Sequence, residues 1–172
     1  MVKLIARTPA QGLLPVTIGA LTLSETVPDT ITAVMPFAGQ GVAVCADLGL
    51  ALPDPNRTTQ QGETVILWAG QNMYLVLNGA PESAHAAISD HSDAWAVFAL
   101  TGPGGDGVLA RLSPIDTRPE HFATGHTART LLGHMNASVT RLSDECLRIM
   151  VYRSMAQTAV HDLTRAMEHA AR

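Results

Sequence analysis

Short apolar runs, separated by glycine, proline and polar residues, recur along the whole chain. In the first run, Val16, Ile18 and Ala20 stand at every second position, which is typical of a strand with one buried face. Two later apolar runs are joined by "GQN", the spacing of a hairpin. By these patterns we predict strands at 16–24, 30–37, 64–69, 73–78, 94–101, 128–134, 137–143 and 146–153.

The clearest helical pattern is at the C-terminal end, over 154–170. Ser154 and Gln157 have the spacing of a capping box, which predicts where this helix begins. Its apolar positions form one stripe: Ala156, Ala159, Val160, Leu163, Met167 and Ala170. His161, Arg165, Glu168 and His169 lie off that stripe and are expected to face solvent. Further helices are predicted at 41–52, 81–91 (with Pro81 as the first residue) and 107–112, with loops at 53–63 and 113–125.

The predicted elements repeat in the two halves of the chain. Residues 30–91 and 94–170 both run strand, glycine turn, helix, proline-containing loop, strands and helix. The two glycine turns align at Gly41 and Gly107, each followed by valine. We therefore expect an α+β fold, one domain over 1–172, built of two ferredoxin-like β-α-β-β-α halves related by a duplication.

Composition excludes several classes of function. The 172 residues are 47% hydrophobic and only 15% charged, which predicts a packed chain with some apolar surface covered by a partner. The formal charge is −4, and the basic residues (Lys3 and ten arginines) form no cluster, so a nucleic-acid partner is not expected. No apolar run reaches the roughly 20 residues of a membrane span. Cys45 and Cys146 are interpreted as thiols in a reducing cytoplasm.

The stretch "TGPGGDGVLARLSPID" matches the spelling of a dinucleotide-binding turn at Gly102, Gly104 and Gly107. However, the predicted helix ends by Pro114 and no second strand follows it, as the dinucleotide fold would require. Asp106 also places a negative charge where a pyrophosphate would lie. We interpret the glycines as a sharp strand-to-helix turn.

Other catalytic patterns are weak. The seven histidines lack the spacing of a helical zinc site, so a metal site would require convergence of distant residues. There is no G-x-S-x-G motif, and the paired carboxylates lie in predicted turns. From the residues alone, the sequence predicts an α+β domain in which no active site can be identified.

An ordered set of segments resembles the gamma subunits of heterotetrameric sarcosine oxidases, within the aminomethyltransferase-like, folate-binding-domain superfamily. These segments are "VILWAGQNMYLVLN" (65–78), "HSDAWAVFALTGPGGDGVLARLSPID" (91–116) and a long stretch from "FATGHTARTLLGH" to "RSMAQTAVHDL" (122–163). "ADLGLALPDPN" (46–56) is similar to the family's first helix and loop. The resemblance implies a folate-binding-domain fold.

The resemblance also implies a partnership. The complex oxidises the methyl group of sarcosine on flavin and releases glycine, hydrogen peroxide and either formaldehyde or 5,10-methylenetetrahydrofolate. FAD, FMN, NAD, tetrahydrofolate and zinc belong to the other subunits (alpha, beta and delta), and the gamma subunit carries no cofactor. The K-G-C-Y-x-G-Q-E signature of one catalytic branch has no counterpart here, because the only lysine is Lys3. No active-site, cofactor or metal residue is therefore carried over.

The expectation is a non-catalytic, cytoplasmic subunit, with Arg129 and Arg153 as candidate interface residues or internal anchors. Two alternatives stay open. One is a free-standing folate-binding or one-carbon transfer protein, and the other is an assembly factor for a flavoenzyme.

Overall fold

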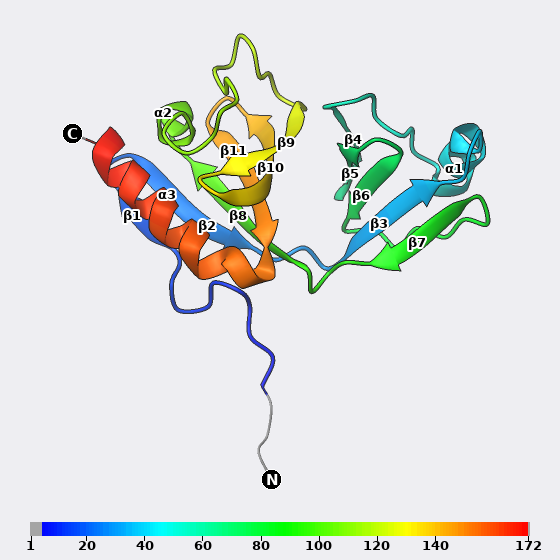
Figure 1. Cartoon of the computed structure of the whole chain (residues 1–172), viewed down its shortest axis with the longest axis horizontal. Helices are drawn as coiled ribbons and strands as arrows, with labels where there is room; N and C mark the ends of the chain where they lie inside the picture. The colour runs from blue at the N-terminus through cyan, green and yellow to red at the C-terminus, as the bar shows by residue number, and fades with distance from the viewer. Residues whose placement is uncertain (1–4, 172) are drawn as a thin grey trace.

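The computed structural model describes residues 5–171, so Lys3 lies outside the described part of the chain. It shows an α+β fold of two antiparallel sheets placed side by side (Figure 1). The six-stranded sheet has the order β1-β2-β8-β11-β10-β9. Its strands are β1 (Val16–Ile18), β2 (Leu21–Thr26), β8 (Trp95–Thr101), β9 (Thr127–Leu132), β10 (Met135–Ser143) and β11 (Cys146–Tyr152).

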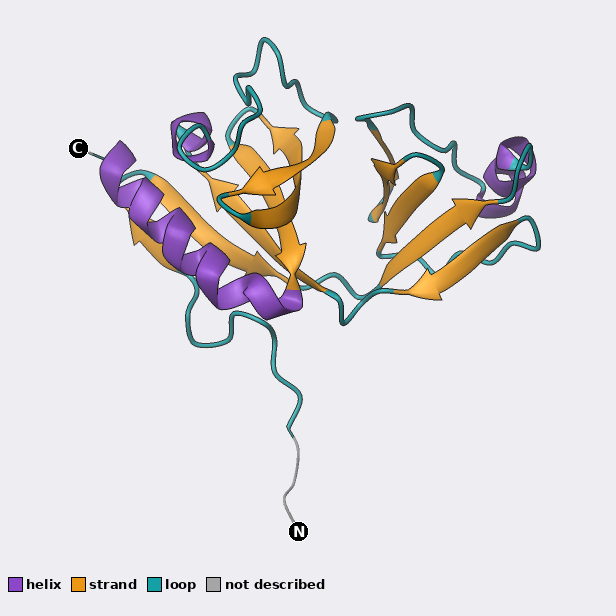
Figure 2. Ribbon diagram, viewed as in Figure 1, coloured by secondary structure: helices purple, strands orange, loops and turns teal. Residues whose placement is uncertain are grey.

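The five-stranded sheet has the order β4-β5-β6-β3-β7. Its strands are β3 (Ile31–Pro36), β4 (Thr58–Gln61), β5 (Thr64–Gly70), β6 (Met73–Leu77) and β7 (Ala86–Asp90). The helices are α1 (Gly41–Leu48), α2 (Gly105–Leu109) and α3 (Ala156–Ala170), and a 3-10 turn, η1 (Arg153–Met155), precedes α3. Figure 2 shows the helices on the outer sides of the two sheets. Between residues 5 and 171, no helix combines the length and the apolar character needed to span a bilayer.

The two-residue period of β8 distributes its side chains between two cores. Ala96, Phe98 and Leu100 face the helices and pack with α2 and α3. Trp95 and Val97 face the other way and pack, with Met150 of β11, against apolar residues of the five-stranded sheet. The near-continuous apolar run of β8 is thus explained by burial on both faces, as expected for a central strand.

The outer face of the five-stranded sheet carries a third, smaller core. Val34, Ile66, Val76 and Ala86 pack there with Val44, the one buried residue of α1. α3 is very different, because it buries six residues: Ala156, Ala159, Val160, Leu163, Ala166 and Met167. His161, Arg165, Glu168 and His169 are exposed as predicted, whereas Ala170 is exposed and Ala166 takes a place in the buried stripe.

Two predictions in the first half of the chain, at 16–24 and 53–63, are corrected. The single strand expected at 16–24 is a hairpin, β1 and β2, that turns at Gly19 and Ala20. The loop expected at 53–63 contains β4, which pairs with β5 around Gly62. Gly62 has a positive φ of 59°, and this conformation lets the chain reverse between β4, which is polar in sequence, and the apolar β5.

The helix predicted at 81–91 is wrong. Residues 86–90 form β7, which pairs antiparallel with β3 from Pro36↔Ala86 to Thr32↔Asp90. Alanine favours helices by its intrinsic propensity. Here, however, the edge of β3 offers a row of backbone hydrogen-bond donors and acceptors, and the segment pairs with them as a strand. Tertiary pairing therefore overrides local propensity.

The capping box predicted at Ser154 and Gln157 is also wrong. The chain enters α3 through η1, and the residue preceding the helix, Met155, makes no side-chain capping hydrogen bond. The strands predicted at 30–37, 64–69, 73–78, 94–101, 128–134, 137–143 and 146–153, and helices at 41–52 and 107–112, are confirmed within a few residues at their ends.

Candidate functional site

The glycine turn that follows β8 is shaped by a close backbone approach. A Cβ at Gly102 would lie 2.1 Å from the carbonyl oxygen of Ala20, in the β1–β2 turn, and Gly102 has a φ of +109°. Gly104, at φ +86°, precedes α2, which is only five residues long. The turn therefore fits two backbone segments together, as the strand-to-helix interpretation predicted.

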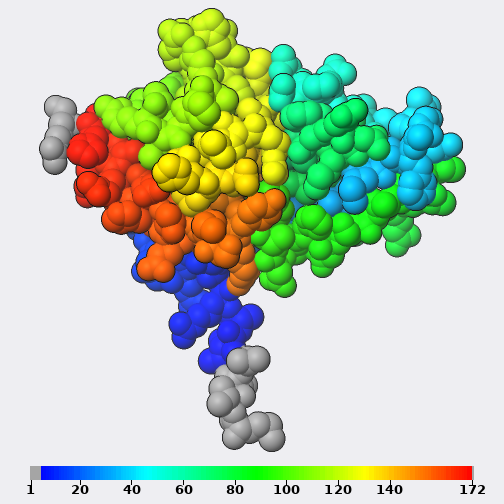
Figure 3. Space-filling model, viewed as in Figure 1, coloured from blue at the N-terminus to red at the C-terminus, as the bar shows by residue number. Residues whose placement is uncertain are grey.

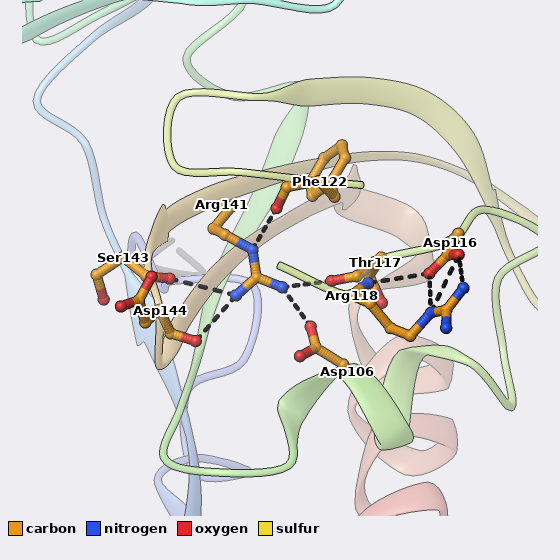
Figure 4. A network of polar contacts seen from close by, with 8 residues as sticks. All are labelled: Asp106, Asp116, Thr117, Arg118, Phe122, Arg141, Ser143 and Asp144. Carbon is orange, nitrogen blue, oxygen red and sulfur yellow. Dashed lines mark hydrogen bonds and ion pairs between the residues drawn. The ribbon is translucent and has the colours of Figure 1, made fainter. Parts of the chain in front are cut away.

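Asp106, in the first turn of α2, is paired with a buried arginine of β10. The side chain of Arg141 is 1% exposed, and its Nη2 donates to the carboxylate of Asp106 and to the carbonyl of Thr117. Its Nε donates to the carbonyl of Phe122 at 2.5 Å, and its Nη1 donates to the carbonyl of Asp144 at 2.9 Å (Figure 4).

Arg141 thus connects three parts of the chain that are distant in sequence. It holds the 113–125 loop, the start of α2 and the β10–β11 turn together through one guanidinium group, whose planar fork suits several acceptors. Sequence reasoning missed this residue. The one signal was a charged residue in the middle of the apolar strand pattern "ASVTRLS", where a buried arginine needs a full set of partners.

Beside this network, Arg118 and Asp116 form an exposed pair, with Nη2 and Oδ2 2.5 Å apart (Figure 4). The hydrogen bonds from Arg118 hold the pKa of the Asp116 carboxyl well below its usual range. This carboxylate stays charged and is occupied by arginine, which does not suit a general acid or base.

Arg129 lies over the Trp95 ring, and Arg153 lies in a cleft that Trp95 also lines. The guanidinium carbon of Arg129 lies 5.4 Å from the centroid of the Trp95 ring. Tyr152, paired with Trp95 across β8 and β11, stacks on the same ring with centroids 4.9 Å apart. Arg153 follows Tyr152 directly and shares a cleft with Trp95.

This cleft, of about 510 Å³, is lined by residues 6–9, by the β2–β3 connection and by Ser92, Asp93, Trp95, Val97 and Arg153. Its polar groups bind one another. Glu25 accepts hydrogen bonds from Thr8 Oγ1 (2.6 Å) and from the amide of Ala10 (2.8 Å). Arg153 donates to the carbonyl of Arg7 at 2.5 Å and lies 3.4 Å from Asp93. The hydrogen bonds around the cleft therefore attach residues 7–10 to the rest of the fold.

Burial changes the ionisation of several groups near the inner faces of the sheets. It lowers the pKa of Arg148 and raises the pKa of the neighbouring Cys146 thiol, which makes that thiol a poor nucleophile at neutral pH. Burial, followed by the charge of Arg57, lowers the pKa of His126. Among residues 5–171 no three His, Cys, Asp or Glu side chains gather in a way that could hold a metal ion.

The polar side chains described above make structural contacts within the chain. We identify no paired acid and base among residues 5–171. Comparison with known proteins adds a single line of evidence. No protein-family model matches the chain. No curated protein matches it either.

Among solved structures, the chain is similar to a chain of the heterotetrameric sarcosine oxidase from Corynebacterium sp. U-96, solved in complex with pyrrole 2-carboxylate. The two share 23% sequence identity, with a TM-score of 0.83 over 97% of this chain and 97% of that chain. At this identity the likeness establishes a shared fold. Its extent also means that the likeness is to that chain as a whole and not to one module of it.

Proposed function

We propose that this chain is a non-catalytic subunit, of the gamma type, of a heterotetrameric sarcosine oxidase. The complex would oxidatively demethylate sarcosine in the cytoplasm to glycine, hydrogen peroxide and either formaldehyde or 5,10-methylenetetrahydrofolate. The observation that carries the proposal is the likeness in fold over 97% of both chains to a chain of such an enzyme. The ordered motifs over residues 65–163 support the same conclusion independently of the fold.

The arrangement of charged side chains supports the non-catalytic role. Three carboxylates that border clefts or turns are each held by a partner: Asp106 by Arg141, Asp116 by Arg118 and Glu25 by Thr8. In the proposed complex, FAD, FMN, NAD, tetrahydrofolate and zinc would be held by the alpha, beta and delta subunits. Arg129 and Arg153 remain proposed interface residues, and their present contacts are internal.

The test is to co-express the chain with the alpha, beta and delta subunits encoded in its own genome and to measure the native mass of the product. We expect one copy of this chain in the active heterotetramer, and no hydrogen peroxide from sarcosine when the chain is incubated alone. The proposal is wrong if the other three subunits assemble and oxidise sarcosine while this chain stays a monomer.

The same preparation separates the alternatives. A free-standing folate-binding protein would bind tetrahydrofolate tightly as an isolated chain, which isothermal titration would detect. An assembly factor would associate with the flavin-free subunits and leave once flavin is loaded. A permanent subunit would do neither.

A further inference from the structure

α1 has the composition of a buried helix but lies on the surface. Of its residues "GVAVCADL", Asp47 alone is charged, and six are apolar. A helix that is apolar on all sides is normally covered on all sides. Here Val44 alone is buried, and Val42 is 85% exposed, more than any other large apolar residue that the structure describes. In Figure 3, α1 lies at the end of the molecule farthest from α3, with its surface open.

Other apolar groups adjoin this helix. Phe37, in the turn that leads into α1, is 52% exposed. Ile88 of β7 is 37% exposed and pairs with Val34, on the outer face of the sheet that α1 covers. Next to α1, a groove of about 390 Å³ is lined by apolar residues (Leu48, Leu50, Ile66 and Val76) and by polar ones (Asp47, Thr64 and Glu82). We call this set, from Phe37 and Val42 to the groove, the α1 surface.

The net charge of the chain is carried by the five-stranded sheet and its connections. Residues 31–90 contain five acidic residues (Asp47, Asp54, Glu63, Glu82 and Asp90) and one basic residue, Arg57. Their formal charge is therefore −4, the same as that of the whole chain, so the rest of the protein is neutral. All five acids are exposed, and Asp47 and Glu82 line the groove. Arg57 lies at the opposite side, where its backbone bridges to His126.

From this arrangement we infer that the α1 surface docks another protein chain, one that presents apolar side chains framed by lysine or arginine. Apolar contact drives such an association, and complementary charge selects the partner and its orientation. A second copy of this chain does not fit, because a two-fold interface would place Asp47 and Glu82 of one copy against the same acids of the other. The inference rests on the proposed function: the partner is another subunit of the complex.

The experiment compares two exposed apolar residues, Val42 and Leu13, in the co-expressed complex. Val42→Glu places a charge on the α1 surface. Leu13→Glu is the control, because Leu13 is also exposed, lies in the turn before β1, and belongs neither to the α1 surface nor to the lining of the Arg153 cleft. We expect Val42→Glu to weaken assembly with the other subunits by at least about tenfold, as measured by biolayer interferometry on the tagged complex. Leu13→Glu should assemble like the wild type, and both isolated variants should keep the wild-type circular dichroism spectrum.

A second pair of variants tests the charge. Glu82→Lys, at the groove, should weaken assembly and reduce its sensitivity to salt, whereas Glu168→Lys, on the exposed side of α3, should change neither. Hydrogen exchange should slow over residues 41–48 when the complex forms.

Each result has a defined meaning. If the wild type assembles and Val42→Glu assembles equally well, the docking surface is wrong and the proposed function stands. If the wild type does not assemble with these subunits, both proposals fail. If the isolated chain is a dimer that Val42→Glu disrupts, a second copy covers the surface and the inferred partner chemistry is wrong.

Discussion

The two sheets share a strand order but differ in the element that follows their last common strand. In the five-stranded sheet the consecutive segments β3-α1-β4-β5-β6 give the order β4-β5-β6-β3. In the six-stranded sheet β8-α2-β9-β10-β11 give the equivalent order β9-β10-β11-β8. The first is then extended by β7 and the second by β2, each beside the first strand of its set. The strand orders agree, but the halves run β-α-β-β-β-β and β-α-β-β-β-α, so neither is the β-α-β-β-α unit predicted from the sequence.

The difference lies in the element that follows the last of these strands. After β11 the chain forms α3, which has a buried apolar stripe and an exposed polar side. After β6 it forms β7, so the outer face of the five-stranded sheet is left with the short, apolar α1. One half is thus closed by its own helix, and the other keeps an apolar and acidic surface. The same sheet plan thus forms a closed core in one half, and in the other it carries the surface that we propose as a docking site.

The largest effect is expected from Arg141, which belongs to the closed half. Arg141→Met leaves Asp106 and three loop carbonyls without their partner, so we expect a loss of about 3–5 kcal/mol in the free energy of unfolding. Urea unfolding followed by tryptophan fluorescence measures it. Arg165→Met, an exposed arginine on α3, should stay within about 0.5 kcal/mol of the wild type. A loss below about 1 kcal/mol for Arg141→Met would show that the network is dispensable.

The two helices can be compared directly. Leu163→Ala on α3 removes a side chain with no exposed surface and should cost about 2–5 kcal/mol. Val42→Ala on α1 should change the stability of the isolated chain by less than about 0.5 kcal/mol. Chemical denaturation of both variants tests this. Equal losses would mean that α1 belongs to the core and would remove the contrast between the two halves.

The turns after β3 and β8 give a smaller contrast. Gly102→Ala combines a positive φ with a clash against the Ala20 carbonyl, so we expect a loss of at least about 2 kcal/mol. Gly39 has a φ of +76°, but a Cβ there would meet no other atom within 4 Å, so Gly39→Ala should cost about 1 kcal/mol. Thermal unfolding of the two variants should rank them in this order, and the reverse order would contradict the close approach at Gly102.

The smallest effect is expected at His126, whose backbone forms an isolated β-bridge with Arg57 between the two halves of the molecule. The pKa of His126 is lowered in the folded state, mainly by burial, so the unfolded chain binds the proton more readily. Its contribution to stability is therefore full above the ordinary histidine pKa of about 6.5 and decreases as the pH falls through that value. Wild type and His126→Gln, unfolded in urea at about pH 7.5 and about pH 5.5, should show a smaller pH-dependent loss for the variant. An identical loss in both proteins would assign the effect to other groups.

Much of the fold could be predicted from the sequence because local pattern and burial agree there. β8 and β11 are apolar enough to require burial on both faces, and α3 has one continuous stripe. The errors fall where the pairing partner is distant. Ala86–Asp90 is helix-prone by composition but completes the edge of β3, and Thr58–Gln61 is polar but pairs with β5.

In the candidate sites too, some features could be predicted from the sequence and others depended on distant pairing. Arg129 and Arg153 could be singled out in the sequence, but their positions near Trp95 depend on the pairing of β9, β10, β11 and β8. Arg141 could not be recognised as the centre of a network, because its acceptors come from several segments, and Asp106 among them lies 35 residues away along the chain.

By itself, the sequence determined most of the strands, the amphipathic C-terminal helix and the absence of a basic cluster, because these depend on residue order and on burial of the nearest apolar side chains. The tertiary structure alone decided which apolar surface is left uncovered. α1 and β8 are both apolar, and only the arrangement of the two sheets places β8 between layers and α1 at the surface. Whether a segment is exposed depends on which other segments pack against it, and its own residues do not contain that information.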